Sequence, residues 1–159
     1  MKKYEFTGET KEIRLLFRTA TLHRIRATVA FGIVEVGDLG GWIEKEENLS
    51  HEGKAWVWGN AEVWGNAEVC GDAKVFSASH VLVIGAIGSR NDFTTFYRDK
   101  DNEITVKCGC FLGKIDRFLE KVTQTHGDSK YALVYRAAVE VAKLQIDLSG
   151  EAPKDADEE

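Results

Sequence analysis

Proline, methionine and cysteine are scarce in this sequence, which has one proline, one methionine and three cysteines among 159 residues. The cysteines are odd in number (Cys70, Cys108 and Cys110), which argues against a disulfide framework and favours free thiols in a reducing compartment. No apolar run approaches the roughly 18 residues of a membrane-spanning helix, and the opening Met-Lys-Lys does not lead into a signal-peptide core. We therefore expect a soluble, cytoplasmic protein with no membrane partner.

The chain also lacks an excess of positive charge. Its 21 Lys and Arg oppose 26 Asp and Glu, and the whole deficit lies in residues 147–159, where six acidic residues face Lys154 alone. Nonspecific nucleic-acid binding needs a basic surface, so this charge balance argues against it. The acidic segment 147–159 is predicted to be solvated and disordered.

Glycine, by contrast, is frequent, and the fifteen glycines gather in the middle of the chain, where a six-residue repeat is visible. From residue 57 the sequence is VWGNAE, VWGNAE, VCGDAK, VFSASH, VLVIGA and IGSRND. The first column is aliphatic, the fifth holds small residues, and Gly-Asn or Gly-Asp pairs supply turn chemistry. Positions of equal parity share one face of a strand, so both columns are predicted to point into a core.

This pattern resembles the hexapeptide repeat of left-handed parallel β-helices, in which three six-residue faces form one coil of about eighteen residues. The resemblance implies a mainly β protein with C-terminal helices, built on a short left-handed parallel β-helix over residues 39–92. Such a short stack lies near the minimum for a repeat array. Members of this family usually form trimers, so a homo-oligomer, a trimer or a multiple of three, is expected.

The residue after each repeat valine is large and apolar, and by parity it points outward. The residues concerned are Trp58, Trp64, Phe76 and Leu82. Left uncovered, they would form a large exposed apolar patch. The protein's own terminal segments or a neighbouring subunit could cover them, and we predict an oligomer interface.

The flanking segments indicate a cap and a C-terminal unit. Residues 1–38 have strand-like patterning and are predicted to form an N-terminal β cap. In the unit 93–146, residues 93–98 and 104–111 are predicted to be the two strands of a hairpin joined by an acidic turn. Apolar side chains at helical spacing, first from Ile115 and then from Tyr131, predict two α-helices.

The Cys108-Gly109-Cys110 motif, together with Cys70 and His126, could suggest a zinc site. One residue between two cysteines is a poor spacing for structural zinc, and strand phase places both thiols on an apolar face. A Cys/His nucleophile pair would lack an orienting acid and an oxyanion loop. We therefore predict no metal, no cofactor and no catalytic residue.

The resemblance also implies acyl transfer as an alternative function, because many hexapeptide-repeat proteins are acyl-CoA transferases with a histidine base at the subunit interface. His51 and His80 lie in or beside repeat units. The regular repeat is too short to form a deep cofactor cleft, and fold analogy alone is a weak argument. A purely structural assembly module is a further alternative.

Anion binding is the function that the sequence favours, because donors gather around the hairpin. The candidate ligand-binding residues are Ser89, Arg90, Thr94, Thr95, Tyr97, Arg98 and Lys107. A guanidinium group with hydroxyls suits a phosphate, and Tyr97 could stack on a base. Thr95 and Tyr97 face one way and Thr94 and Arg98 the other, so two subunits would have to share one ligand. Alternatively, the arginines form ordinary salt bridges with nearby aspartates.

The whole layout resembles a group of small phage- or prophage-encoded repeat proteins. The segments that carry the resemblance are 22–27, 37–44, 47–53, 88–98 and 108–111. Small phage oligomers with positive pockets often act as sponges for nucleotide immune signals. The resemblance therefore implies a non-enzymatic homo-oligomer that sequesters a small anionic, nucleotide-like ligand, such as a cyclic nucleotide or an ADP-ribose derivative, in an anti-defence role.

Overall fold

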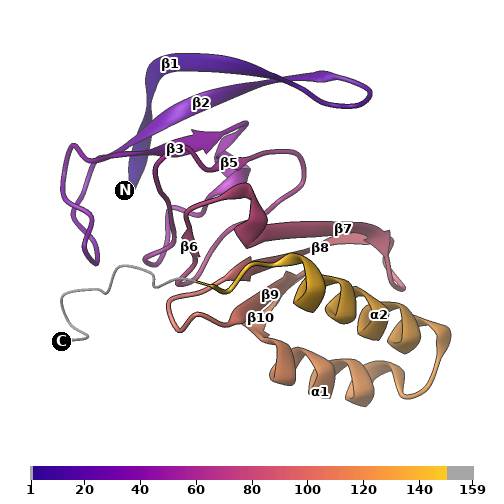
Figure 1. Ribbon diagram of the computed structural model, residues 1–159. Helices are drawn as coiled ribbons and strands as arrows, with labels where there is room; N and C mark the ends of the chain where they lie inside the picture. The colour runs from indigo at the N-terminus through magenta and orange to yellow at the C-terminus, as the bar shows by residue number, and fades with distance from the viewer. Residues whose placement is uncertain (1, 150–159) are drawn as a thin grey trace.

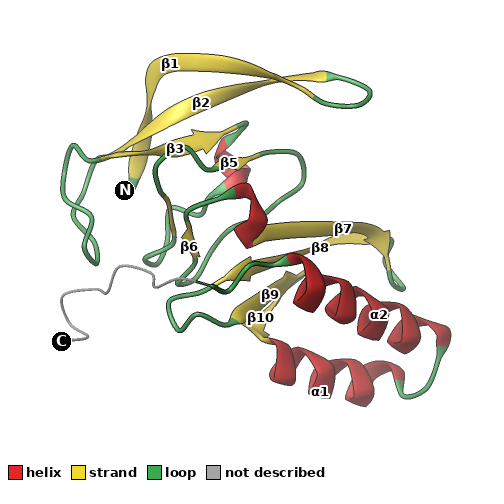
Figure 2. Cartoon of the chain, in the orientation of Figure 1, coloured by secondary structure: helices red, strands yellow, loops and turns green. Residues whose placement is uncertain are grey.

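The computed structural model describes residues 2–149, which form three β-sheets, two α-helices and two short 3-10 turns (Figures 1 and 2). The strands are β1 (Tyr4–Arg14), β2 (Thr19–Ala27), β3 (Leu39–Ile43), β4 (Trp56–Val57), β5 (Glu62–Val63), β6 (Lys74–Val75), β7 (Val81–Ile87), β8 (Asp92–Arg98), β9 (Ile104–Cys108) and β10 (Phe111–Lys114). The 3-10 turns are η1 (Glu46–Asn48) and η2 (Ala78–His80), and the helices are α1 (Ile115–His126) and α2 (Lys130–Gln145).

The N-terminal sheet has the order β1-β2-β3-β5. β1 and β2 form a long antiparallel hairpin, from the pair Tyr4↔Ala27 to the pair Arg14↔Thr19 (Figure 1). β3 pairs antiparallel with β2 and in parallel with β5, so β5 is an edge strand.

The predicted left-handed parallel β-helix over residues 39–92 is wrong. Parallel pairing is limited to two short strand pairs in different sheets, β3 with β5 and β4 with β6, and to one isolated bridge between Leu49 and Val69. From Val81 onward the chain forms β7, which pairs antiparallel with β8 in a third sheet. Because the three sheets are separate, the described residues do not form a solenoid.

The repeat nevertheless has the burial that its period predicts, up to residue 75. Val57, Val63, Val69 and Val75 are at most 2% exposed. The pair Val57↔Val75 also has the eighteen-residue separation expected for one coil. The pattern ends at Val81, which is only half-buried, because β7 is a seven-residue strand of an antiparallel sheet.

The start of the chain is fixed on the repeat segment by two buried polar side chains. The Tyr4 hydroxyl donates a hydrogen bond to the carbonyl of Leu49 at 2.6 Å, and its ring stacks on His51 at 4.1 Å. The Lys3 ammonium donates to the carbonyl of Ala55 at 2.6 Å. Burial lowers the pKa of Lys3 to about 8, because it removes water from the charged amine. These contacts attach the N-terminal strands to the core of the repeat.

The C-terminal sheet has the order β10-β9-β8-β7. The predicted hairpin is confirmed, since β8 and β9 pair antiparallel through Phe96↔Val106. Its acidic turn is stabilised by Asp99, whose buried carboxylate accepts a hydrogen bond from Thr105 Oγ1 at 2.7 Å and two more from backbone N–H groups of the turn. The returning strand is shorter than predicted: it ends at Cys108, and a two-residue turn leads into β10.

Both predicted helices are confirmed, and they pack against this sheet (Figure 1). Phe118 of α1 and Tyr135 of α2 meet edge to face, with ring centroids 5.6 Å apart. They belong to a second hydrophobic cluster, distinct from the one around the repeat valines. Not every apolar side chain of α2 faces the sheet, since Tyr131 and Val141 are 43% and 47% exposed.

Neither α1 nor α2 is both long and apolar enough to cross a membrane, and the described range has no other α-helix. The predicted disordered segment 147–159 lies outside the described residues from position 150 onward. Asp147, the first residue of this segment, contacts the end of the repeat segment: its N–H donates a hydrogen bond to the carbonyl of Ser79 at 3.1 Å.

Candidate functional site

Most of the predicted anion-binding side chains on the hairpin are buried. Four of them are at most 2% exposed: Thr94, Thr95, Tyr97 and Arg98. Thr95 Oγ1 accepts a hydrogen bond from the N–H of Glu68 at 3.0 Å, and Arg98 Nη1 lies 3.3 Å from His80 Nε2. Thr95 and Arg98 thereby connect the C-terminal sheet to the repeat segment. The expectation that they form an anion site on the hairpin faces is therefore corrected.

The predicted interface residues do not form an exposed row either. Trp58 and Phe76 stack on each other, with ring centroids 4.7 Å apart. Leu82 packs against the C-terminal hydrophobic cluster, and Trp64 lines a groove on the surface. All four side chains are half-buried within one chain, so the described structure covers most of the surface that was assigned to a partner.

The remaining three predicted ligand-binding residues separate into two places. Lys107 hydrogen-bonds the carbonyl of Gly109 and faces a shallow depression beside Glu68. Ser89 and Arg90 are exposed in the turn between β7 and β8, at the rim of a different cavity. Only Ser89 and Arg90 of the predicted set are therefore brought together in a cavity.

This cavity has a volume of about 230 Å³ and lies between the β7–β8 turn, the β9–β10 turn and the two helices. Lys121 and Thr125 of α1 line it together with Ser89 and Arg90. Two cations, two hydroxyl groups and one carboxylate, that of Asp92, thus line one opening, so the cations exceed the anions by one. Both cations sit on exposed residues, so the protein without a ligand keeps them hydrated and bears no desolvation cost for holding them at the rim.

The floor of the cavity is aromatic. Phe111, Phe118 and Tyr135 line it, with Phe111 and Phe118 centroids 5.5 Å apart. The His126 ring stacks on Tyr135 at 5.8 Å, with an interplanar angle of 26°. Offset and edge-to-face rings of this kind present both faces and edges to a further flat ring.

The position of the β7–β8 turn depends on Gly88. Its φ is +79°, and a Cβ at this position would lie 1.9 Å from Tyr135 Oη. Only glycine allows both this backbone conformation and this contact. Asn91, which also has a positive φ of 49°, completes the turn. The Tyr135 hydroxyl thus packs directly on the turn that carries Ser89 and Arg90.

Burial raises the pKa of Tyr135, and the neighbouring Cys108 thiol and Asp92 carboxylate raise it further, whereas Arg90 acts in the opposite direction. The phenol therefore stays neutral at physiological pH. A neutral hydroxyl can donate a hydrogen bond to an anion, which a phenolate could not.

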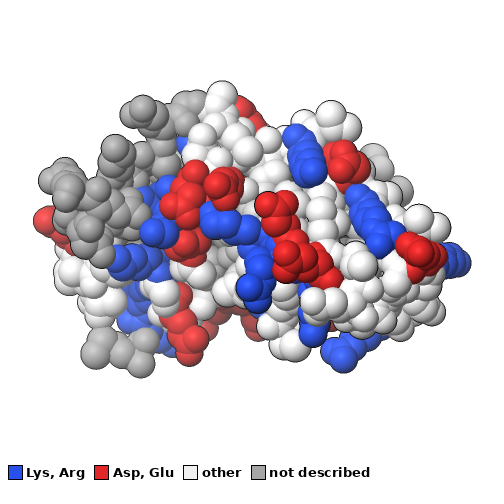
Figure 3. Space-filling view, turned by 90° about the horizontal axis from the view of Figure 1, so that it is seen from below, with Lys and Arg blue, Asp and Glu red and all other residues white. Residues whose placement is uncertain are grey.

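The overall charge of the protein surface does not explain how this cavity would attract an anion. On the face shown in Figure 3, Lys and Arg atoms are interspersed with Asp and Glu atoms, and neither sign covers a broad area. Attraction of an anion to the cavity would therefore rest on the local placement of Arg90 and Lys121.

Both histidines proposed as acyl-transfer bases have structural contacts. The Nδ1 atom of His51 accepts a hydrogen bond from the Lys3 N–H, and that of His80 accepts one from the Phe76 N–H, each at 3.0 Å. Burial lowers the pKa of both rings, and Arg98 lowers that of His80 further. These contacts orient the rings within the fold.

Cys108, Cys110 and His126 line the same cavity, whereas Cys70 lies elsewhere, 3.8 Å from the Tyr97 hydroxyl. Within residues 2–149, no three His, Cys, Asp or Glu side chains are grouped so that they could hold a metal ion. Thr94 Oγ1 donates a hydrogen bond to Cys108 Sγ at 3.4 Å, which connects the cavity wall to the buried strand behind it.

Sequence reasoning missed the contribution of α1 to this cavity. Phe118, Lys121, Val122 and Thr125 have the spacing of one helix face, so a cation and a hydroxyl follow the apolar stripe. That signal was present, but the sequence does not show which loop faces the stripe. The chain matches no protein-family model, and it matches no curated protein either.

Proposed function

We propose that this protein binds a small anionic ligand with a flat ring, of the nucleotide type, in the cavity between the β7–β8 turn and α1. The observation that carries the proposal is the pairing of Arg90 and Lys121 at the rim with an aromatic floor that includes Tyr135. An arginine fork and a lysine suit phosphate oxygens, and aromatic side chains suit a base.

The size of the cavity limits what it can enclose. About 230 Å³ is less than the ~300–1,000 Å³ typical of sites that bury a whole drug-sized ligand. One ring can therefore be enclosed while the charged groups of the ligand remain at the rim, where Ser89 and Arg90 are exposed. This arrangement suits a mononucleotide or one half of a larger cyclic or ADP-ribose-type molecule.

The proposed role is capture of the ligand, without a chemical step. Acyl transfer is the alternative, but the structural contacts of His51 and His80 give neither ring the position of a free base. Sequestration of a nucleotide signal, the anti-defence role implied by the phage-type resemblance, would need only binding. A homo-oligomer remains part of the proposal, although the expectation of a trimer depended on the β-helix.

Isothermal titration calorimetry with AMP, 3′,5′-cyclic AMP, ADP-ribose and inorganic phosphate tests the proposal. We expect at least one nucleotide to bind, and Arg90→Ala to weaken it by roughly tenfold or more, which corresponds to the loss of a charge-assisted contact. Lys130→Ala is the control, because Lys130 is an exposed cation outside the cavity. No heat from any nucleotide, or equal affinity in the Arg90 variant, would overturn the proposal.

A further inference from the structure

The β1–β2 hairpin carries two large apolar side chains into solvent at its tip. Leu16 is 87% exposed and Phe17 is 93% exposed. The turn that carries both is closed by a hydrogen bond from the Leu15 N–H to the Arg18 carbonyl at 2.8 Å. Figure 1 shows this hairpin at the top of the molecule, with its tip extending away from the remaining elements. Adjacent, fully exposed apolar side chains are typical of an interaction site.

An ion pair holds the tip in place. Arg18 forms two hydrogen bonds with the Glu44 carboxylate, at 2.6 and 3.0 Å. Glu44 Oε1 also accepts a hydrogen bond from the N–H of Gly65 at 2.8 Å. The tip is therefore fixed beside the corner that contains Gly65. A tip that is already ordered loses less conformational entropy when it binds.

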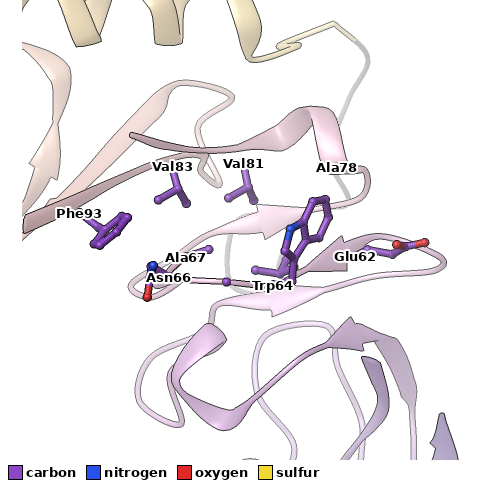
Figure 4. A pocket seen from close by; sticks show the side chains of 10 residues that line it. Glu62, Trp64, Asn66, Ala67, Ala78, Val81, Val83 and Phe93 are labelled. Carbon is purple, nitrogen blue, oxygen red and sulfur yellow. The ribbon is translucent and has the colours of Figure 1, made fainter. Parts of the chain in front are cut away.

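A groove of about 290 Å³ lies on the other side of the same corner (Figure 4). Trp64, Val81, Val83 and Phe93 supply apolar side chains to it. In Figure 4, Val81 and Val83 point from β7 toward the corner, and Phe93 stands at one end. The groove also runs along β5, which among residues 2–149 hydrogen-bonds only to β3 and is therefore an edge strand. An uncovered edge beside an apolar groove is a ready site for another chain.

The two features have complementary charges. Arg14 is exposed where β1 runs into the tip, and Glu68 is exposed next to the groove, near Phe93. Neither residue forms an ion pair within the described part of the chain. The tip thus combines apolar side chains with an exposed cation. The apolar groove adjoins a depression in which the carboxylates of Glu68 and Asp92 outnumber the one cation, Lys107.

We propose that a second copy of this chain occupies the groove, so that the tip of each hairpin, residues 14–18, docks into the groove of the other copy. Tip and groove lie on the two sides of the Gly65 corner. A two-fold axis near this corner would therefore place the tip of the first copy in the groove of the second, and the tip of the second in the groove of the first. The result is a closed, isologous dimer in which no tip or groove is left over. This inference goes beyond the ligand site, which lies at the other end of β7.

Sedimentation velocity over a concentration series is the first test. We expect a dimer for the wild-type chain and a monomer for Phe17→Glu. That variant should still fold, because the side chain is 93% exposed. Leu144→Glu is the matched control, since Leu144 is 89% exposed on the outer face of α2. A wild-type monomer, or a dimer lost in the Leu144 variant and kept in the Phe17 variant, would overturn the proposal.

Charge reversal is a sharper test. In a dimer of Arg14→Glu chains, the new glutamate of each tip would meet Glu68 of the other copy, and this repulsion should weaken the dimer by roughly tenfold or more. Glu68→Arg alone should have the same effect, because two arginines would then meet. An equimolar mixture of the two variants should dimerise as well as the wild type, because each tip then meets a groove of opposite charge. A mixture that remains as weak as the separate variants would rule out the proposed contact, and a different protein bound at the tip would do so too.

Discussion

Release of the proton from the buried Lys3 side chain is predicted to make the free energy of unfolding of this protein rise with pH in alkaline solution. The Lys3 ammonium is 3% exposed and donates to the carbonyl of Ala55 at 2.6 Å. Burial lowers its pKa from 10.5 to about 8. Between these two pH values the unfolded chain still holds the proton and the folded chain has released it. Because the unfolded state binds more protons there, the free energy of unfolding increases with pH.

The magnitude follows from the pKa difference. At about 1.4 kcal/mol per pH unit, a change from 10.5 to about 8 corresponds to roughly 3 kcal/mol. Below pH 8 the whole cost of burying the charge opposes folding, and above pH 10.5 it is absent. Tyr4 acts in the opposite sense at the alkaline end, because burial raises its pKa and its unfolded form ionises first.

A difference measurement isolates Lys3 from Tyr4. Urea unfolding of the wild type and of Lys3→Met, followed from pH 7 to pH 10.5, should show the wild type gaining stability relative to the variant. Lys2→Met should show no such change, because the Lys2 side chain is 67% exposed. Titration of the Lys3 ε-carbon by NMR gives the pKa directly, even where the variant folds poorly. Parallel curves for wild type and variant, together with an ordinary Lys3 pKa, would refute this reasoning.

Three further outcomes are expected from urea unfolding at neutral pH. Val57→Ala should cost about 2 kcal/mol, because this valine is fully buried, whereas Val36→Ala, at 67% exposure, should cost less than about 0.5 kcal/mol. Asp99→Asn should cost about 2 kcal/mol or more, because a buried carboxylate loses its charge-assisted hydrogen bonds in the hairpin turn. Gly88→Ala should cost more than about 1 kcal/mol and displace Tyr135, which the NMR shifts of its ring would report; unchanged ring shifts would contradict the packing described above.

Local patterns in the sequence predicted the elements whose stability depends on near neighbours. The spacing of Ile115, Phe118 and Val122 predicted α1, because one face of a helix is defined by residues three and four apart. The hairpin of β8 and β9 was predictable from strand patterning on both sides of an acidic turn. The burial of the repeat valines was also predictable, since parity places them on one side of short strands.

The course of the chain after Val75 could not be predicted in this way. Residues 81–87 are almost entirely apolar, so they fit a parallel position on the repeat as well as an antiparallel position in a sheet. Which of the two forms depends on the partner strand, because β7 packs on both clusters: Val81 and Val83 contact the one around the repeat valines, and Leu82 and Ile84 contact the C-terminal one. The family resemblance described the period correctly and the architecture wrongly for this reason.

In the candidate site, too, part of the arrangement was predictable from the sequence and part depended on the tertiary structure. The sequence by itself singled out Arg90 as a candidate anion donor and predicted the helix that carries Lys121. Only the tertiary structure decided that these two cations share one cavity and that Arg98 is buried. Side-chain position within an element follows from local geometry, whereas the meeting of a turn with a distant helix depends on how whole sheets and helices pack.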